Sequence, residues 1–467
     1  MPEESHWLSL LEVSDRIAAG LVSPLELTRA LLARIERIDP VLRSYATVTP
    51  EQALAGATRA EREIRRGERH GPLHGVPIAV KDLCARRGVP TAAGMAILRD
   101  RRPEVDSTVV ARLEKAGAVL LGQLQLTEGA SVVHHPTIEP PRNPWNIERS
   151  PGGSSSGSGV ATAAGLCFGS LGSDTAGSIR IPSFWCGVAG LKPTWGRVSR
   201  FGVFPLAETL DCIGPMARRV GDLAALLRVL AGPDPADPTA SRRRVPDYLA
   251  VLADGIPGVR IGVDEAYVMH DTMPQLGKAV LASGAVFGKL GATMRSVRLP
   301  DMRPATDAAI TILSAECAHA HETWFPARAS EYGPHLRELI DEGRMLTACD
   351  YAAAQAVRET FRGQLAAIFE EIDLLLCPPM FVPASPTSTM AAMPGRLSMF
   401  AEAMRFTAPW NLSGNPTLTL PCGYTTDDLP LALQLVARPF EEELVLRAGH
   451  AYESATEWHR RHPRDPE

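Results

Sequence analysis

Short apolar runs alternate with amphipathic stretches along most of this chain. The runs Val76 to Val80 and Leu374 to Cys377 have the length of buried strands and are too short for helices. In Tyr351 to Glu371 and in Glu442 to Trp458, apolar residues instead recur at helical spacing. This alternation predicts an α/β protein built on a mostly buried mixed sheet.

The opening segment, up to about Ile64, is predicted to be helical. Ser23, Pro24 and Glu26 combine an N-cap, a proline at the first helical position and a capping-box glutamate. Apolar residues then follow at helical spacing, at Leu27, Leu31, Leu32 and Ile35. Further strands are expected at Ala118 to Leu121, Val259 to Val263, Met294 to Leu299 and Leu431 to Val436, and further helices at 107–115 and 275–290.

One loop, Gly232 to Arg244, is rich in Pro, Asp and Arg and is the best candidate for a linker. Because the runs on both sides of it resemble strands of one sheet, we expect a single domain over residues 1–467. Within it we expect an N-terminal helical layer (1–68), a core that carries the catalytic motifs (69–231) and the remainder of the sheet and pocket (245–467).

The composition argues against several classes of protein. The net charge of -5 lacks the clustered Lys and Arg of a nucleic-acid-binding surface. No stretch reaches the ~20 apolar residues of a membrane span, and the acidic N-terminus lacks the regions of a signal peptide. The eight cysteines lie singly from Cys84 to Cys422, a spacing typical of free thiols. We therefore expect a cytoplasmic protein without a nucleic-acid or membrane partner.

Lys81 follows the apolar strand in the run Gly75 to Asp82. A lysine at a strand end commonly extends its ammonium group to solvent. In a dry site, however, desolvation favours the neutral amine, which can accept a proton near neutral pH. The lysine by itself does not decide between these two interpretations.

The first glycine-rich segment is Pro151 to Gly159. A flexible linker is one interpretation, but the apolar segment Val160 to Phe168 follows at once and favours a buried helix. A phosphate-binding loop would need Gly-Lys-Ser/Thr at its end, which is absent. The remaining interpretation is a tight turn that presents hydroxyls and backbone amides to a reacting centre.

The second glycine-rich segment, Gly172 to Arg180, contains Ser178. A simple turn of small residues would explain it, but small residues before a nucleophile also let backbone N–H groups converge on one point. One such donor to an oxyanion is typically worth roughly 3–4 kcal/mol. A nucleophilic serine needs a base, and neither segment contains a histidine that could complete a Ser-His-Asp triad.

These motifs resemble those of the amidase signature hydrolases, a family that includes fatty acid amide hydrolase, malonamidase, peptide amidase and the A-type chain of the glutamine-dependent tRNA amidotransferase. The resemblance covers most of the chain and implies one domain with a large, mixed, twisted sheet covered by helices on both faces. Its markers are Gly75 to Asp82, Arg142 to Trp145, Pro151 to Ser156, Gly172 to Pro182 and Gly190 to Thr194, with weaker ones at Thr209 to Pro215, Asn411 to Pro416 and Leu429 to Leu435.

The resemblance implies that Ser178 is the nucleophile, Ser154 a serine in a cis peptide and Lys81 the base. Lys81 would take a proton from Ser154 while Ser154 takes one from Ser178. No metal and no organic cofactor is implied. The oxyanion hole would consist of the backbone N–H groups of Thr175, Ala176, Gly177 and Ser178, while Ser155 would support the relay and Asp174 and Arg180 would hold the loop.

Two departures from the family pattern bear on the site. Ala176 stands where many members have glycine, which is tolerable unless the residue needs a positive φ. Gln123-Leu124-Gln125 replaces the commoner Lys-Thr-Asn. We expect this segment, on through Gly129 and Ala130, to line the substrate pocket, so the choice of substrate stays open.

Two further clusters lie outside these motifs. The pair His134-His135 is expected to be loop histidines near the pocket, because no third ligand follows at a spacing useful for a metal. A cluster of apolar residues could be core or an adaptable pocket wall, and we favour the wall because Pro394-Gly395 interrupts any simple helix. Its members are Met390, Met393, Met399, Phe400, Met404 and Phe406.

The leading hypothesis is hydrolysis of a small-molecule amide through an acyl-enzyme, with esters, anilides and carbamates (urethanes) as further substrates of similar carbonyl geometry. One alternative is a component of an amidotransferase, which would need a partner protein and glutaminase activity. Another is a catalytically inactive binding protein that keeps the fold. The natural substrate and the oligomeric state stay open.

Overall fold

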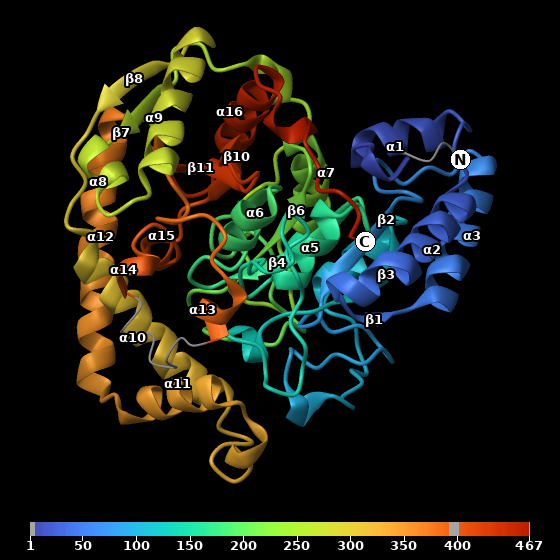
Figure 1. Ribbon diagram of the computed structural model, residues 1–467, viewed down its shortest axis with the longest axis horizontal. Helices are drawn as coiled ribbons and strands as arrows, with labels where there is room; N and C mark the ends of the chain where they lie inside the picture. Colours follow the sequence, from blue (N-terminus) through green and yellow to red (C-terminus); the bar gives the residue numbers. More distant parts are fainter. Residues whose placement is uncertain (1–4, 392–400, 467) are drawn as a thin grey trace.

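Eleven strands form one sheet that runs through the molecule in the computed structural model, which describes residues 5–391 and 401–466 (Figure 1). Their order is β1-β3-β2-β4-β6-β5-β10-β11-β9-β7-β8. Parallel pairs join β2 to β3 and β4, and β7 to β8 and β9, while the other neighbours are antiparallel. The sheet is therefore mixed, as the sequence predicts. The strands are β1 (Tyr45–Val48), β2 (Pro77–Lys81), β3 (Val119–Leu124), β4 (Gly169–Asp174), β5 (Ala189–Lys192), β6 (Cys212–Ala217), β7 (Arg260–Val263), β8 (Thr293–Ser296), β9 (Leu374–Cys377), β10 (Thr417–Tyr424) and β11 (Pro430–Ala437).

Strands from both sides of the predicted linker belong to this one sheet. β5 lies before the 232–244 loop in the chain and pairs with β10 after it, Leu191 opposite Leu418. The loop also packs on the core, since Ser241 N donates to Gly196 O over 2.7 Å. It therefore connects parts of one sheet.

The central strand β4 has helical segments on both of its faces because it is built from small residues. A Cβ at Gly169 would lie 2.8 Å from Leu226 of α7 (Val220–Leu230). A Cβ at Gly172, which points to the opposite face because the spacing is odd, would lie 2.9 Å from Ile179, just before α6 (Arg180–Cys186). Glycine at these positions lets the helical segments approach the sheet closely.

The N-terminal layer contains a strand that the sequence did not predict. α2 (Pro24–Leu42) begins as expected, with the Ser23 hydroxyl accepting the Glu26 N–H over 3.1 Å. Between it and α3 (Pro50–Arg65), however, β1 pairs antiparallel with β3, so the prediction of a wholly helical segment is wrong there. Tyr45–Val48 is not a continuous apolar run, and its pairing partner lies far along the chain.

Three helices, coloured yellow to orange in Figure 1, pack together on one side of the molecule. α10 (Met302–Ala320) packs on both α11 (Pro334–Met345) and α12 (Ala348–Glu371). α12 starts earlier than predicted because Thr347 and Asp350 form a capping box. The remaining α-helices are α1 (Leu10–Ala18), α4 (Thr108–Lys115), α5 (Ser156–Ala163), α8 (Glu265–Met269), α9 (Pro274–Lys289), α13 (Thr387–Ala391), α14 (Ala401–Met404), α15 (Ala408–Ser413) and α16 (Glu442–Ser454).

The cysteines are free thiols, and Cys349 alone among them is exposed. This agrees with the spacing, which favours unpaired buried thiols. Within residues 5–391 and 401–466, no helix combines the length and the apolar character that crossing a membrane requires.

The surroundings of two glycines, one on α11 and one on α12, predict that alanine substitutions there have opposite effects on stability. A Cβ at Gly343 would collide with the Ser314 carbonyl oxygen, so Gly343→Ala should lower the free energy of unfolding by ~1–3 kcal/mol. Gly363 lies on the exposed side of α12 with nothing near its Cβ position, so Gly363→Ala should raise it by up to ~1 kcal/mol. Denaturant unfolding of both variants measures the difference, and a Gly343→Ala variant as stable as the parent chain would contradict the packing.

Candidate active site

Lys81 ends β2 with its side chain fully buried and its Nζ surrounded by three hydroxyl groups. Nζ lies 2.7 Å from Ser154 Oγ, 2.8 Å from Ser155 Oγ and 2.8 Å from Ser173 Oγ. The lysine therefore does not reach solvent, and the first of its two interpretations is excluded. Among the residues described, no carboxylate forms an ion pair with it.

Burial lowers the pKa of Lys81 to about 7, even though Cys84, Asp174 and Asp211 act to raise it. A neutral amine has two N–H donors and one lone pair, so it can donate to two of the three hydroxyls and accept from the third. Ser155 Oγ already donates to Ser173 O over 3.2 Å. The lone pair is then left for the hydroxyl proton of Ser154 or Ser173, which is the arrangement a general base requires.

Ser173 is the member of this cluster that the sequence motifs did not indicate. It lies in β4, whose Ser170 is opposite Ala79 of the parallel neighbour β2. That register brings the carboxyl ends of the two strands together, so Ser173 and Lys81 meet across 92 positions of sequence. Ser173 lies beside Asp174 in the segment Gly172 to Arg180, which was identified from the sequence. The strand order was needed to show that its side chain meets Lys81.

The segment Pro151 to Ser155 forms a tight turn, and the following residues Ser156 to Gly159 are the start of the buried helix α5. The peptide bond between Gly153 and Ser154 is cis. Gly152 has a φ of 82°, and a Cβ there would lie 3.0 Å from Pro182 N. The turn thus presents Ser154 and Ser155 to the lysine.

Ser178 lies on the loop between β4 and α6 and faces a cavity. The two glycine-rich motifs meet here, because Ser155 N donates to Ser178 O over 3.3 Å and both Gly153 and Ser178 line the cavity. Ser178 is half-buried, whereas Ser154 is buried beside Lys81. The candidate nucleophile is therefore the member of the set that a substrate can reach.

The loop that carries Ser178 is held by a fully buried ion pair between Asp174 and Arg180. Arg180 Nη2 lies 2.8 Å from Asp174 Oδ1, and Arg180 Nε lies 2.9 Å from Oδ2. Burial alone would raise the pKa of Asp174, but the Arg180 guanidinium holds it well below its usual range. The carboxylate also accepts the Ile179 N–H over 3.0 Å. The Asp174 carboxylate thus accepts hydrogen bonds from the residues on both sides of Ser178, Gly177 and Ile179.

One of the four expected oxyanion donors is already engaged. Gly177 N donates to Asp174 Oδ1 over 2.8 Å, so that N–H does not point freely into the cavity. The N–H groups of Thr175, Ala176 and Ser178 have no hydrogen-bond partner within the described part of the chain. Gly177 has a φ of 129°, whereas Ala176 does not have a positive φ, so alanine is accommodated there.

The cavity beside Ser178 encloses about 730 Å³ of empty space, part of it open to solvent. Its wall combines residues of the loop after β3 with residues of α6, α10, α11, α13 and α14. The lining residues are Ala130, Ser131, Val132, Gly153, Thr175, Ala176, Ser178, Ile181, Trp185, Leu206, Leu313, Leu339, Met380, Met390, Ala403 and Met404.

Of the segment expected to line the pocket, only the part at its C-terminal end does so. β3 continues through Gln123 and Leu124, and the Gln123 amide is buried, donating to Cys84 O over 3.1 Å. Gln123 to Gln125 therefore does not line the described cavity, and that expectation is wrong. Ala130 does line it, whereas Gly129 lies behind the wall, where a Cβ would lie 2.8 Å from Leu336.

His134 lies beside the turn that carries Ser154, and in the described part of the chain neither His134 nor His135 belongs to a group of possible metal ligands. His134 Nε2 is 3.1 Å from Ser156 Oγ, and burial together with the charge of Lys81 lowers the pKa of His134 to about 3. Of the apolar cluster, Met390 and Met404 line the cavity as expected, while Phe406 is buried in the core. Met393, Met399 and Phe400 lie outside the described residues.

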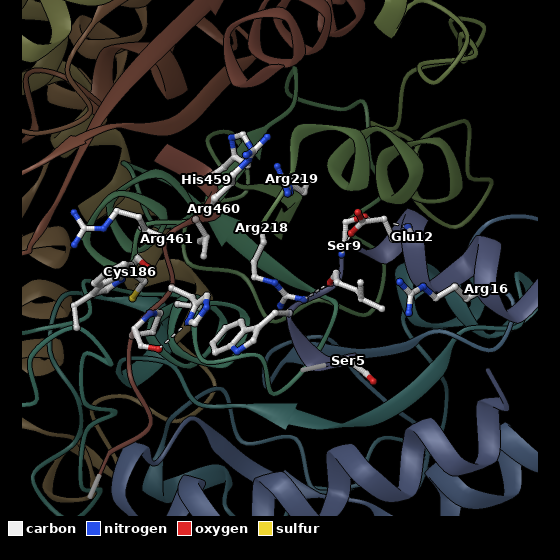
Figure 2. Close-up of a pocket in the computed structure, with 18 residues that line it drawn as sticks. Ser5, Ser9, Glu12, Arg16, Cys186, Arg218, Arg219, His459, Arg460 and Arg461 are labelled. Carbon is white, nitrogen blue, oxygen red and sulfur yellow. Dashed lines mark hydrogen bonds between the residues drawn. The ribbon is translucent and has the colours of Figure 1, made fainter. Parts of the chain in front are cut away.

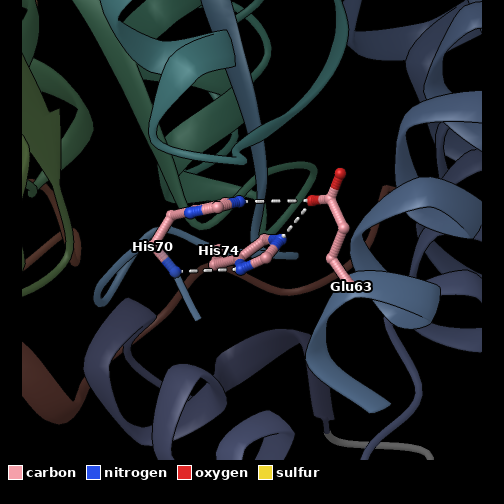
Figure 3. A group of neighbouring side chains, drawn as sticks. All are labelled: Glu63, His70 and His74. Atoms are coloured by element: carbon pink, nitrogen blue, oxygen red, sulfur yellow. Dashed lines mark hydrogen bonds and ion pairs between the residues drawn. The ribbon is translucent and has the colours of Figure 1, made fainter. Parts of the chain in front are cut away.

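A separate group of possible metal ligands consists of Glu63, His70 and His74 (Figure 3). Both imidazole Nε2 atoms approach the same carboxylate oxygen, at 3.4 Å for His70 and 3.1 Å for His74. His74 Nδ1 accepts the His70 backbone N–H over 3.1 Å, so its Nε2 carries the proton and donates to Glu63. The group is thus a satisfied hydrogen-bonded cluster, and His74 offers no free lone pair to a metal.

A second large cavity lies between the two terminal segments and is lined by several arginines (Figure 2). Arg218 is its central cation, and its guanidinium donates to Thr162 O, Cys167 O, His6 O and Leu8 O over 2.7–3.0 Å. This arginine ties the N-terminal segment to the core. The cavity includes none of the residues around Ser178.

Comparison with known proteins agrees with this geometry. The Amidase family profile matches residues 26–446. A Mycobacterium tuberculosis protein provisionally named amidase AmiD is 47% identical over 461 residues, with 98% of this chain and 96% of that protein covered. The A-type chain of the glutamyl-tRNA(Gln) amidotransferase from Chloroflexus aggregans is 39% identical, with 98% and 99% covered.

Among solved structures, the peptide amidase from Stenotrophomonas maltophilia superposes with a TM-score of 0.84 at 31% identity, with 99% of both chains covered. The fold, the order of the motifs and these full-length similarities lead to one conclusion: the chain belongs to the amidase signature family, whose members act on amide C–N bonds.

Proposed function

We propose that this protein hydrolyses carboxylic amides through an acyl-enzyme on Ser178, with Lys81 as the base and Ser154 as the proton relay. The observation that carries the proposal is the buried Lys81 amine, 2.7 Å from the hydroxyl of Ser154, whose neighbour Gly153 lines the same cavity as Ser178. A lysine with a pKa near 7 is half neutral at physiological pH, which suits a general base.

In the first half-reaction, Ser178 Oγ attacks the carbonyl carbon and its proton passes to Ser154 Oγ, whose own proton passes to Lys81 Nζ. The carbonyl oxygen becomes an oxyanion near the N–H groups of Thr175 and Ala176, and each such donor is worth roughly 3–4 kcal/mol. The tetrahedral intermediate then collapses, and the leaving amine takes the proton back along the same path. Water repeats the sequence on the acyl-enzyme and releases the acid.

Esters, anilides and carbamates present a carbonyl of the same geometry and belong to the proposed range of substrates. A cytoplasmic location is also proposed, because the mostly buried, unpaired cysteines suit a reducing compartment.

A second candidate is the A-type chain of a glutamine-dependent amidotransferase, because 39% identity extends over the full length of such a chain. It requires glutaminase activity and a partner protein. Release of ammonia from glutamine, together with a co-purifying partner, would favour this candidate over a free-standing hydrolase. A catalytically inactive binding protein would instead leave Ser178 unlabelled by an active-site-directed fluorophosphonate.

The role of Ser178 predicts a loss of turnover in Ser178→Ala. The substitution removes the attacking oxygen, so kcat for a nitroanilide amide should fall by ~10⁴-fold or more. Ser183→Ala is a matched control, because that buried hydroxyl bonds Ile179 O over 2.8 Å and does not line the cavity. The control should keep activity within about tenfold, and turnover by a clean Ser178→Ala preparation would refute the assignment.

The role of Lys81 predicts the direction of the pH dependence. Burial lowers the pKa of this amine to about 7, so it is protonated below that pH and neutral above it. Because only the neutral amine accepts a proton, kcat/KM should rise as pH increases through about 7 and fall as pH decreases.

Glu128 provides the control for this profile, since burial raises the pKa of its carboxyl to about 7 as well. The inflection should persist in Glu128→Gln, while Lys81→Met should lose most of its activity. An inflection that disappears in Glu128→Gln would assign the titration to the carboxyl group and contradict the role of Lys81.

A further inference from the structure

The wall of the cavity beside Ser178 is apolar apart from a few hydroxyl groups. Trp185, Leu206, Leu313 and Leu339 provide much of it, together with the three methionines Met380, Met390 and Met404. Among the described lining residues none carries a charge. A substrate that fills this space therefore contacts mainly carbon and sulfur atoms.

The polar side chains in the wall, other than Ser178, are occupied by partners within the protein. Ser131 Oγ donates to Glu128 O over 2.7 Å, and Thr175 Oγ1 donates to Asp211 Oδ1 over 2.5 Å. Trp185 Nε1 donates to Val382 O over 3.2 Å, so this tryptophan offers its ring to the cavity and not its N–H. Little hydrogen-bonding capacity remains for a polar substituent.

The charged groups behind the wall are also occupied. Arg180 and Asp174 form their own buried pair, and the Glu128 carboxylate accepts the Gly333 N–H over 3.0 Å. Arg405, next to Met404, forms an ion pair with Glu402. Within the described chain, the cavity thus offers neither a free cation for a carboxylate nor a free anion for an ammonium group.

This geometry points to a substrate class: we infer that the site acts on uncharged amides with a largely apolar body and discriminates against those that carry a carboxylate or an ammonium near the scissile bond. The inference rests on the proposed function. Burial of an unpaired charge should cost about 100-fold or more in kcat/KM, and each added methylene should gain about fourfold. The flexible methionines allow apolar groups of different shapes.

Matched amide pairs test this inference on both sides of the bond. On the acyl side, 4-methylpentanoyl-p-nitroanilide is compared with its charged isostere, the succinyl anilide, and an acetyl-to-pentanoyl series gives the gain per methylene. On the amine side, an N-butyl amide is compared with its 3-aminopropyl isostere. We expect each charged member to be hydrolysed about 100-fold or more slowly, and glutamine hydrolysis to be lower still.

The outcomes separate the two proposals. If charged isosteres or glutamine match the neutral amides within tenfold while Ser178→Ala is inactive, the substrate class is wrong and the hydrolase stands. The substrate class is also overturned if a fluorophosphonate labels Ser178 but no apolar amide is hydrolysed. If nothing is hydrolysed and Ser178 is not labelled, the proposed function falls and the inference falls with it.

A pair of variants tests whether the cavity wall causes the discrimination. Met390→Lys places a cation in the half-buried wall and should raise the rate of the succinyl anilide, relative to its neutral isostere, by about tenfold. Met345→Lys is the matched control, since Met345 is 82% exposed at the end of α11 and does not line the cavity. An unchanged ratio in Met390→Lys would show that the substrate does not contact this wall and would overturn the inference.

Discussion

The buried ion pair between Asp174 and Arg180 is the interaction on which the active-site loop depends. Its carboxylate holds the backbone N–H of Gly177, and its guanidinium reaches Asn411 and Gln434 in the last part of the chain. The pair thus fixes the loop that carries the candidate nucleophile and joins it to the far side of the sheet. Removing one partner of such a pair leaves an unpaired buried charge, which typically costs about 3–5 kcal/mol.

At Lys81, burial disfavours the charged form of the side chain. It has no carboxylate partner among the described residues, and its amine contacts only hydroxyl groups, so desolvation lowers its pKa instead of being offset by an ion pair. A directly bonded carboxylate would stabilise the ammonium and keep the lysine protonated at neutral pH. The Asp174–Arg180 ion pair thus supports the loop, while the Lys81 amine contacts only hydroxyl groups.

The cavity wall combines residues of the two serine motifs with residues from the C-terminal half of the chain. The lysine and serine motifs lie on β2, β4 and the turns between strands and helices at the centre of the sheet. Five of the sixteen described lining residues come from α10, α11, α13 and α14 in the C-terminal half, and the others come from the loop after β3, the two serine segments, α6 and nearby loops. Similarity to amidases with different substrates is understandable on this basis, because the wall can change while the central turns keep their backbone geometry.

Local patterns in the chain were sufficient to predict the α/β class, the approximate bounds of several helices and the two serine motifs, because caps, periodicity and glycine-rich turns are encoded within short segments. The tertiary structure was needed to show that β1 is a strand, that Ser173 joins Lys81, that Gln123 turns away from the cavity and that the Gly177 N–H is occupied. Most of these features depend on a contact with a residue that is distant in the sequence. A local sequence pattern does not indicate which segments become adjacent once the sheet has formed.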